Sequence, residues 1–246
     1  MRIWDINPGY LNRQSLLGEH RELHGIVSII SNNKKGYAHH PETRRWRGYG
    51  WALQQRHGLL AAEMTLRGFH DYSPVVSPSP EEIWPEIFPE IFIDEPGQQF
   101  QLLTAKYRNK EQGRIPLPQN SQQLWSHHKY SVLARDQNLY RKLGRAVAGS
   151  KSAHDFATLA KTLTLQLRQR PTPGSLRNAL HHMWGHISDY SSLSKGEIAS
   201  WPLPRLAAEI ARCALLKKEP YLMHSTALSE LQAWIKPPPQ EMPPSP

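Results

Sequence analysis

One short stretch near the start of the chain carries residues suited to contact with a charged ligand. They recur at helical steps of four, three and four: Gln14, Gly18, Arg21 and Gly25. Glu22 lies beside this face. Glycine inside a helix costs about 1 kcal/mol relative to alanine, so two glycines on one polar face indicate that a backbone approaches closely there. The approaching group is either a nucleic-acid backbone or the chain's own N-terminus.

Two helices would position these residues. The first covers residues 11–30, and its predicted buried face consists of Leu16, His20, Leu23, Val27 and Ile30. The second is predicted from Pro41 to Arg67, with Gly68 as its C-terminal stop. Its arginines give it a basic side: Arg44, Arg45, Arg47 and Arg56. Such a basic helix suits contact with DNA phosphates.

Three segments of the first half together resemble a known family. They are Met1-Arg-Ile-Trp-Asp5, Gln14-x-Leu-Leu-Gly-Glu-His-Arg-Glu-Leu-His24 and Gly36-Tyr-Ala-His-His-Pro-Glu-Thr43. This pattern is similar to that of the pyrimidine-dimer DNA glycosylases, the phage endonuclease V family and its bacterial relatives. The resemblance runs from Met1 to about Pro118.

The resemblance implies a bifunctional DNA glycosylase and abasic-site lyase. Its nucleophile would be the N-terminal α-amine, here that of a retained Met1 because the bulky Arg2 disfavours methionine removal. Its acidic residue would be Glu22. An α-amine has an ordinary pKa of about 7.7–8, against about 10.4 for lysine, so roughly a tenth of it is unprotonated at neutral pH. The amine would attack C1′, and Glu22 would assist β-elimination. This imine chemistry needs no cofactor and no metal.

The expected DNA contacts come from the N-terminus and the two helices: Arg2, Arg13, Gln14, His20, Arg21, His24, His39, His40, Arg44 and Arg47. Arg2 and Arg21 would hold phosphates and favour the free amine by charge repulsion. Phage members carry His and Arg where this chain has Ser15 and Gly25, and both positions contribute to DNA contact in those proteins. The choice between pyrimidine dimers and other damaged bases therefore stays open.

Charge and cysteine content indicate the class of binding partner and the cellular compartment. The formal net charge of +9 over 246 residues favours a polyanionic partner, nucleic acid before membrane. The sole cysteine, Cys213, excludes an internal disulfide and a cysteine-based zinc cluster, and fits a reducing compartment. No stretch resembles a signal peptide or a membrane span, so we expect a soluble, cytoplasmic protein.

An acidic, proline-rich segment interrupts this basic chain over residues 72–96. From Asp71 to Gln99 there is no lysine or arginine, and proline at this density prevents a long helix. Two alternatives remain for residues 78–95. The acidic strip shields the DNA-binding groove or binds a partner, or it is a connecting loop whose aromatic residues pack on the domain.

The second half is helical again, with helices predicted near 121–148, 153–169, 175–190, 203–218 and 226–235. It resembles the YbgA-type helical domain of unknown function through His128-Lys-Tyr130, Tyr140-Arg-x-Leu-Gly-Arg145, Pro173-x-Ser175-x-x-Asn178-x-Leu180-x-His182 and Glu219-Pro-Tyr-Leu222. Several polar residues could line a phosphate-binding surface: His128, Lys129, Tyr130, Arg141, Arg145, Asn178 and His182. They make residues 121–190 a candidate for a second nucleic-acid contact.

The sequence therefore predicts an all-α protein of two helical domains. The first covers residues 1–118, the second covers residues 119–236, and a disordered proline-rich tail follows over 237–246. The predicted function is a DNA-repair glycosylase and abasic-site lyase that cleaves double-stranded DNA at UV-induced pyrimidine dimers, with base flipping to expose C1′. Two alternatives are a glycosylase/lyase for other damaged bases and a non-catalytic DNA- or RNA-binding module.

Overall fold

The computed structural model describes residues 1–75, 85–149, 155–191, 193 and 195–235. These residues form α-helices and two short 3-10 helices, with no strand among them, which confirms the predicted all-α fold. None of the described helices is long and apolar enough to cross a lipid bilayer. The predicted tail 237–246 and the acidic residues of 78–84 lie outside the described part of the chain.

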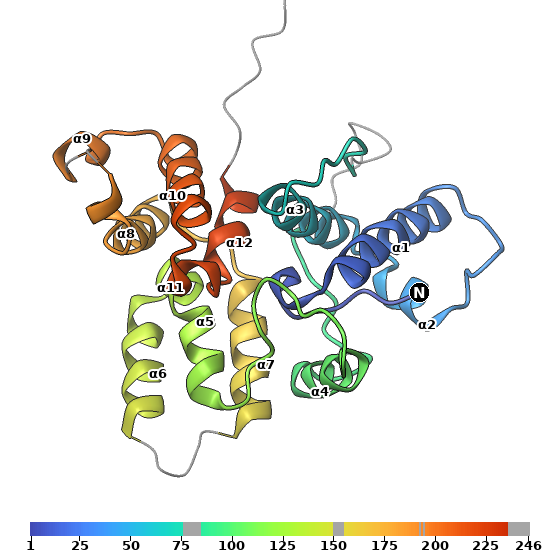
Figure 1. The fold of residues 1–246 in the computed structure, drawn as a ribbon. Helices are drawn as coiled ribbons and strands as arrows, with labels where there is room; N and C mark the ends of the chain where they lie inside the picture. Colours follow the sequence, from blue (N-terminus) through green and yellow to red (C-terminus); the bar gives the residue numbers. More distant parts are fainter. Residues whose placement is uncertain (76–84, 150–154, 192, 194, 236–246) are drawn as a thin grey trace, which may run out of the picture.

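Figure 1 shows the helices in their order along the chain. In chain order they are η1 (Pro8–Tyr10), α1 (Arg13–Ser31), α2 (Pro41–Trp46), α3 (Gly50–Leu66), α4 (Pro96–Lys106), α5 (Ser121–Leu133), α6 (Gln137–Gly149), α7 (Phe156–Leu167), α8 (Pro173–Trp184), η2 (Ser188–Tyr190), α9 (Lys195–Ala199), α10 (Leu203–Lys217), α11 (Pro220–Met223) and α12 (Ala227–Trp234).

Three of the predicted helices are each divided in the structure. The helix expected over 175–190 ends at Trp184, and the 3-10 helix η2 follows from Ser188. The helix expected over 41–67 is α2 and α3, because Arg47 has an extended ψ of 126° and Gly48 has a φ of +85°. The helix expected over 121–148 is α5 and α6. There the Asp136 carboxylate accepts the backbone N–H groups of Asn138 and Leu139 at 2.8 and 2.9 Å, which starts a new helix. Gly68, with a φ of +79°, follows the end of α3 as predicted.

Hydrophobic packing joins the two halves of the chain. One core cluster contains Ile3, Trp46 and Phe100 from the first half together with Leu124 and Leu163 from the second. Helices α3 and α12 pack together, as do α4 and α7 (Figure 1). The domain boundary near residue 118 stays a prediction, but the core does not stop at that point in the sequence.

The described part of the acidic segment, residues 85–95, packs on the protein. Phe88 meets the Trp51 ring edge-to-face at 5.3 Å, and the Arg168 guanidinium lies over Phe88 at 5.2 Å and over Phe92 at 4.6 Å. These contacts fit the connecting-loop alternative for these residues.

A buried carboxylate also links the halves. Glu63 on α3 is fully buried and accepts hydrogen bonds from Arg67 at 2.7 Å, Arg114 at 2.8 Å and the Ser229 hydroxyl of α12 at 2.6 Å. Arg114 also donates to the Ser225 carbonyl at 3.2 Å. Burial opposes ionisation of Glu63, but the two arginines outweigh it and hold the pKa of this carboxyl below its ordinary value.

We expect Glu63→Gln to lower the free energy of unfolding by about 3–5 kcal/mol, because it leaves the guanidinium of Arg114 inside the protein without its carboxylate. Urea-induced unfolding followed by circular dichroism measures the difference. Lys161→Gln, which breaks a half-exposed pair with Glu95, is the control and should change stability by less than about 1 kcal/mol. Equal effects of both substitutions would contradict a structural role for Glu63.

Stability should also fall as the pH is lowered from about 6.5 toward 4. Burial lowers the pKa of His127 to about 3 and that of His128 to about 4. Both imidazoles therefore stay neutral in the folded state and bind a proton on unfolding, and stability present above the unfolded pKa is lost as the pH falls. The loss for His128 is of order 3 kcal/mol.

Urea titrations at several pH values measure this dependence. His128→Gln should flatten the slope, whereas His182→Gln, which changes an exposed histidine, should keep it. An unchanged slope in His128→Gln would show that other groups cause the acid sensitivity.

Candidate active site at the N-terminus

The backbone of residues 2–6 is held by side-chain oxygen atoms. Each of its N–H groups donates to a carboxylate or an amide oxygen: Arg2 to Glu22 Oε2 (2.5 Å), Ile3 to Glu42 Oε1 (3.2 Å), Trp4 to Glu19 Oε1 (3.1 Å), and Asp5 and Ile6 to Gln99 Oε1 (2.8 and 3.4 Å). These acceptors belong to α1, α2 and α4. Three helices therefore fix where the N-terminal segment lies.

Buried arginines balance the carboxylates. Arg56 of α3 forms a bidentate pair with Glu19 at 2.7 and 2.9 Å and donates to the Ile6 carbonyl at 2.8 Å. Burial raises the pKa of Glu19 and of Glu42, while Arg56 and Arg45 oppose that rise. The arginines therefore favour the charged form that accepts the backbone hydrogen bonds.

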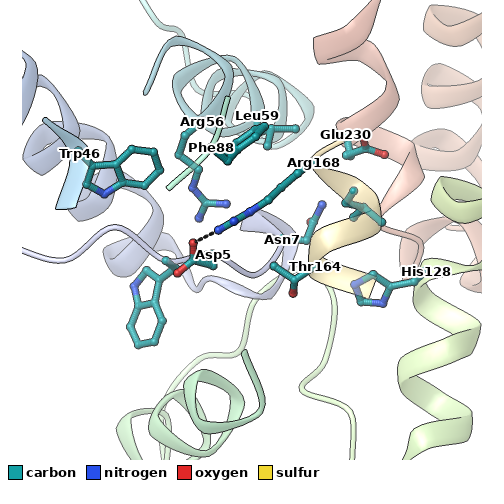
Figure 2. Close-up of a pocket in the computed structure, with 12 residues that line it drawn as sticks. Asp5, Asn7, Trp46, Arg56, Leu59, Phe88, His128, Thr164, Arg168 and Glu230 are labelled. Atoms are coloured by element: carbon teal, nitrogen blue, oxygen red, sulfur yellow. Dashed lines mark hydrogen bonds and ion pairs between the residues drawn. The ribbon is translucent and has the colours of Figure 1, made fainter. Parts of the chain in front are cut away.

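Asp5 is the centre of a second charged group, in which the guanidinium groups of Arg56 and Arg168 point toward its carboxylate (Figure 2). Arg168 donates to Asp5 at 2.6 Å, Arg45 forms an ion pair with it, and the Gln99 amide donates at 2.9 Å. The cavity beside this group has a volume of about 40 Å³. It has room for very few water molecules and none for a nucleotide, so these charges support the N-terminal segment.

Glu22 and Met1, the two residues expected to be catalytic, come together in the structure. Both are half-buried, and Met1 packs against the hydrophobic core. The Glu22 carboxylate lies 2.5 Å from the nitrogen of Arg2, one peptide unit from the α-amine. Backbone bond lengths then place the amine within roughly 6 Å of that carboxylate. An amine and a carboxylate at this separation can act on adjacent atoms of one substrate.

Arg2 has partners that the sequence did not reveal. Its side chain forms an ion pair with Asp94, and its guanidinium lies 4.4 Å from the centre of the Trp4 ring. Asp94 belongs to the acidic segment just before α4. A phosphate that binds Arg2 must therefore compete with this carboxylate.

The polar face of α1 is open. Arg13, Gln14 and Arg21 are exposed, and a side chain added at Gly18 or Gly25 would meet no atom within 4 Å. The chain's own N-terminus therefore does not cover these glycines, which overturns that alternative. Ser15 is buried and offers no contact to a ligand on this face.

Helix α2 borders a groove of about 550 Å³. The lining residues are His39, Pro41, Arg44, Arg45, Tyr49 and residues 89–93. His39, Arg44 and Arg47 are exposed, as a contact with DNA requires, whereas the His40 imidazole accepts the Glu42 N–H at 3.2 Å and caps the helix. The structure thus gives His40 a local structural task beside the expected one.

His20 and His24, two of the expected DNA contacts, form a cluster with a third histidine. Their rings pack on each other with centroids 4.7 Å apart, and each also packs on His57 of α3. Asp71 completes this group. The sequence placed His20 on the buried face of α1, which agrees with its partial burial.

The residues expected to form a phosphate-binding surface in the second half do not share one surface. His128 and Tyr130 are buried, Lys129 and Asn178 are half-buried, and Arg141, Arg145 and His182 are exposed. A second nucleic-acid contact in this half is not supported by their arrangement.

Comparison with known families gives one match in each of the two segments for which the sequence analysis noted a family resemblance. Residues 1–76 match the family model described as pyrimidine dimer DNA glycosylase, and residues 129–200 match one described as a protein of unknown function (DUF1722). No curated protein and no solved structure matches the chain. The first match supports a pyrimidine-dimer glycosylase-like role for the N-terminal segment. In its first 76 residues, which contain Met1 and Glu22, the chain is therefore similar to the pyrimidine-dimer DNA glycosylases.

Proposed function

We propose that this protein is a DNA glycosylase and abasic-site lyase that acts at UV-induced pyrimidine dimers through the α-amine of Met1. The observation that carries the proposal is the hydrogen bond from the Arg2 backbone to Glu22, which holds a carboxylate next to the N-terminus. The family match over residues 1–76 supports the substrate class.

The reaction begins when the lone pair of the free amine attacks C1′ of the damaged nucleotide. The C1′–N1 glycosidic bond breaks, the base leaves with its bonding electrons and takes up a proton, and the sugar ring opens to an imine. Removal of a proton from C2′ then drives β-elimination, in which the C3′–O3′ bond breaks and the 3′ phosphate leaves.

Glu22 is the base that accepts the C2′ proton in this proposal. One of its oxygen atoms accepts the Arg2 N–H, and the other has no hydrogen-bond partner among the described residues. The bonded oxygen fixes the carboxylate, and the other is available for proton transfer.

DNA would lie across the open face of α1 and the exposed side of α2. Arg13, Arg21, Arg44 and Arg47 are exposed there and can neutralise phosphates. The net charge of +9 favours this binding. The damaged nucleotide would leave the duplex to reach the amine, and the groove beside α2 is large enough for an extruded base.

The same chemistry on other damaged bases is the second candidate. Ser15 is buried and Gly25 has no side chain, so neither supplies the DNA contact that the corresponding residues make in phage members. Losing both contacts would change lesion recognition without changing the amine or the carboxylate.

Borohydride should trap a covalent adduct between Met1 and duplex DNA that contains a pyrimidine dimer or an abasic site. The imine forms only on a free amine, so reduction fixes the protein on the sugar. The protein must carry no N-terminal tag, and intact mass should first establish that its chain starts at Met1. Peptide mass spectrometry then locates the adduct.

A variant with one residue added before Met1 should lose the adduct, whereas one with a residue added after Pro246 should keep it. An adduct with the abasic site but not with the dimer would favour the second candidate. DNA binding without any adduct would favour a non-catalytic binding module.

Glu22→Gln should slow strand cleavage at an abasic site by about 10²- to 10⁴-fold, the usual contribution of a general base. The amide oxygen can still accept the Arg2 N–H, so imine trapping should persist. Single-turnover cleavage and trapping measure the two steps separately. Glu111→Gln, at an exposed carboxylate, is the control and should cleave at the normal rate. Normal cleavage by Glu22→Gln would remove Glu22 from the mechanism.

A further inference from the structure

Three imidazoles and one carboxylate meet where α1 packs on α3. His20 and His24 come from α1, His57 from α3 and Asp71 from the loop after α3. One ligand atom from each residue lies within 4.8 Å of the other three. The three rings contact one another directly, with centroids 4.7–5.1 Å apart. Three separate parts of the chain therefore converge on one point.

Two nitrogen atoms of this cluster lack the hydrogen bond that buried polar atoms normally make. His57 is only 5% exposed, and its Nε2 is buried without a hydrogen-bond partner, as is Nε2 of His24. The Asp71 carboxylate contacts two of the three rings. Its Oδ1 forms a hydrogen bond with His20 Nε2 at 3.2 Å, whereas its Oδ2 lies 3.3 Å from His57 Nε2 without the geometry of a hydrogen bond. Buried polar atoms are almost always paired, so this arrangement points to a missing ligand.

We propose that His20, His24, His57 and Asp71 bind a divalent transition-metal ion, and that this ion is Zn²⁺. Imidazole nitrogens and a carboxylate oxygen are ligands that zinc prefers, and four of them complete a tetrahedral shell. Ligand atoms 2.0–2.1 Å from a tetrahedral ion are roughly 3.4 Å apart. The carboxylate distances to His20 and His57 are already close to that value.

The residue types suit this role. A neutral imidazole offers a nitrogen lone pair to the metal, and the Asp71 carboxylate supplies a negative charge.

Four protein ligands leave no open position, which is typical of a structural zinc site. The ion would join α1 to α3 and to the loop after it. Successive helix residues are about 100° apart, so Glu22, two residues from His20 and from His24, projects on the opposite side of α1. The site thus lies behind the N-terminal carboxylate, and this inference does not rest on the proposed function.

The test is calorimetric titration of Zn²⁺ into the untagged, chelator-stripped full-length protein. We expect one ion per chain with a Kd below about 1 μM and a higher Tm in its presence. Co²⁺ in place of Zn²⁺ should give the visible absorption of a tetrahedral complex. His24→Gln removes one ligand at a nitrogen without a hydrogen bond, so it should fold and bind Zn²⁺ at least ~100-fold more weakly.

Asp71→Asn should weaken binding as well, and His182→Gln, at an exposed histidine outside the cluster, should bind normally. Circular dichroism checks that each variant is folded. Equal binding by all three variants would place the ion on surface histidines and overturn the proposal. The absence of binding to the folded wild-type protein would overturn it too.

Discussion

The interaction on which the rest of the site depends is the set of hydrogen bonds from the backbone of residues 2–6 to side-chain oxygens. This segment has no regular secondary structure, so its buried N–H groups need acceptors from elsewhere. Leaving one unpaired costs about 1–3 kcal/mol. Carboxylates as acceptors in turn need buried cations, and Arg56 meets that need for Glu19. The need of these backbone N–H groups for acceptors therefore determines where charged side chains lie on several helices.

The second half of the chain takes part in this support. Arg168, at the end of α7, donates to Asp5 and lies over Phe88 and Phe92. It lies inside residues 129–200, the segment that matches the family of unknown function. Arg114 and Glu63 make a second connection to Ser229 of α12. The C-terminal half thus stabilises the N-terminal segment directly, whatever else it binds.

The sequence predicted the helical class and most helix positions because apolar periodicity and glycine and proline signals are local. From the sequence we predicted one helix where the structure has α2 and α3, and one where it has α5 and α6, because we did not recognise Gly48 and Asp136 as helix breaks. We missed the buried roles of Glu19 and Glu42, since a charged residue on a helix is ordinarily solvated and their partners are distant in sequence. The histidine cluster was missed for the same reason: His20 and His24 have a ligand-like spacing, but His57 and Asp71 come from another helix and its loop.

Helix α1 makes three different sets of contacts, each on a different side of the helix. Glu22 meets the N-terminus, Glu19 is buried against Arg56, and His20 and His24 face α3. A rotation by one residue, about 100°, would break all three sets of contacts at once. The contacts of Glu19, His20 and His24 therefore limit how far the Glu22 carboxylate can move. A general base loses efficiency when its position is loose, so packing at the rear of α1 is part of what the proposed active site needs.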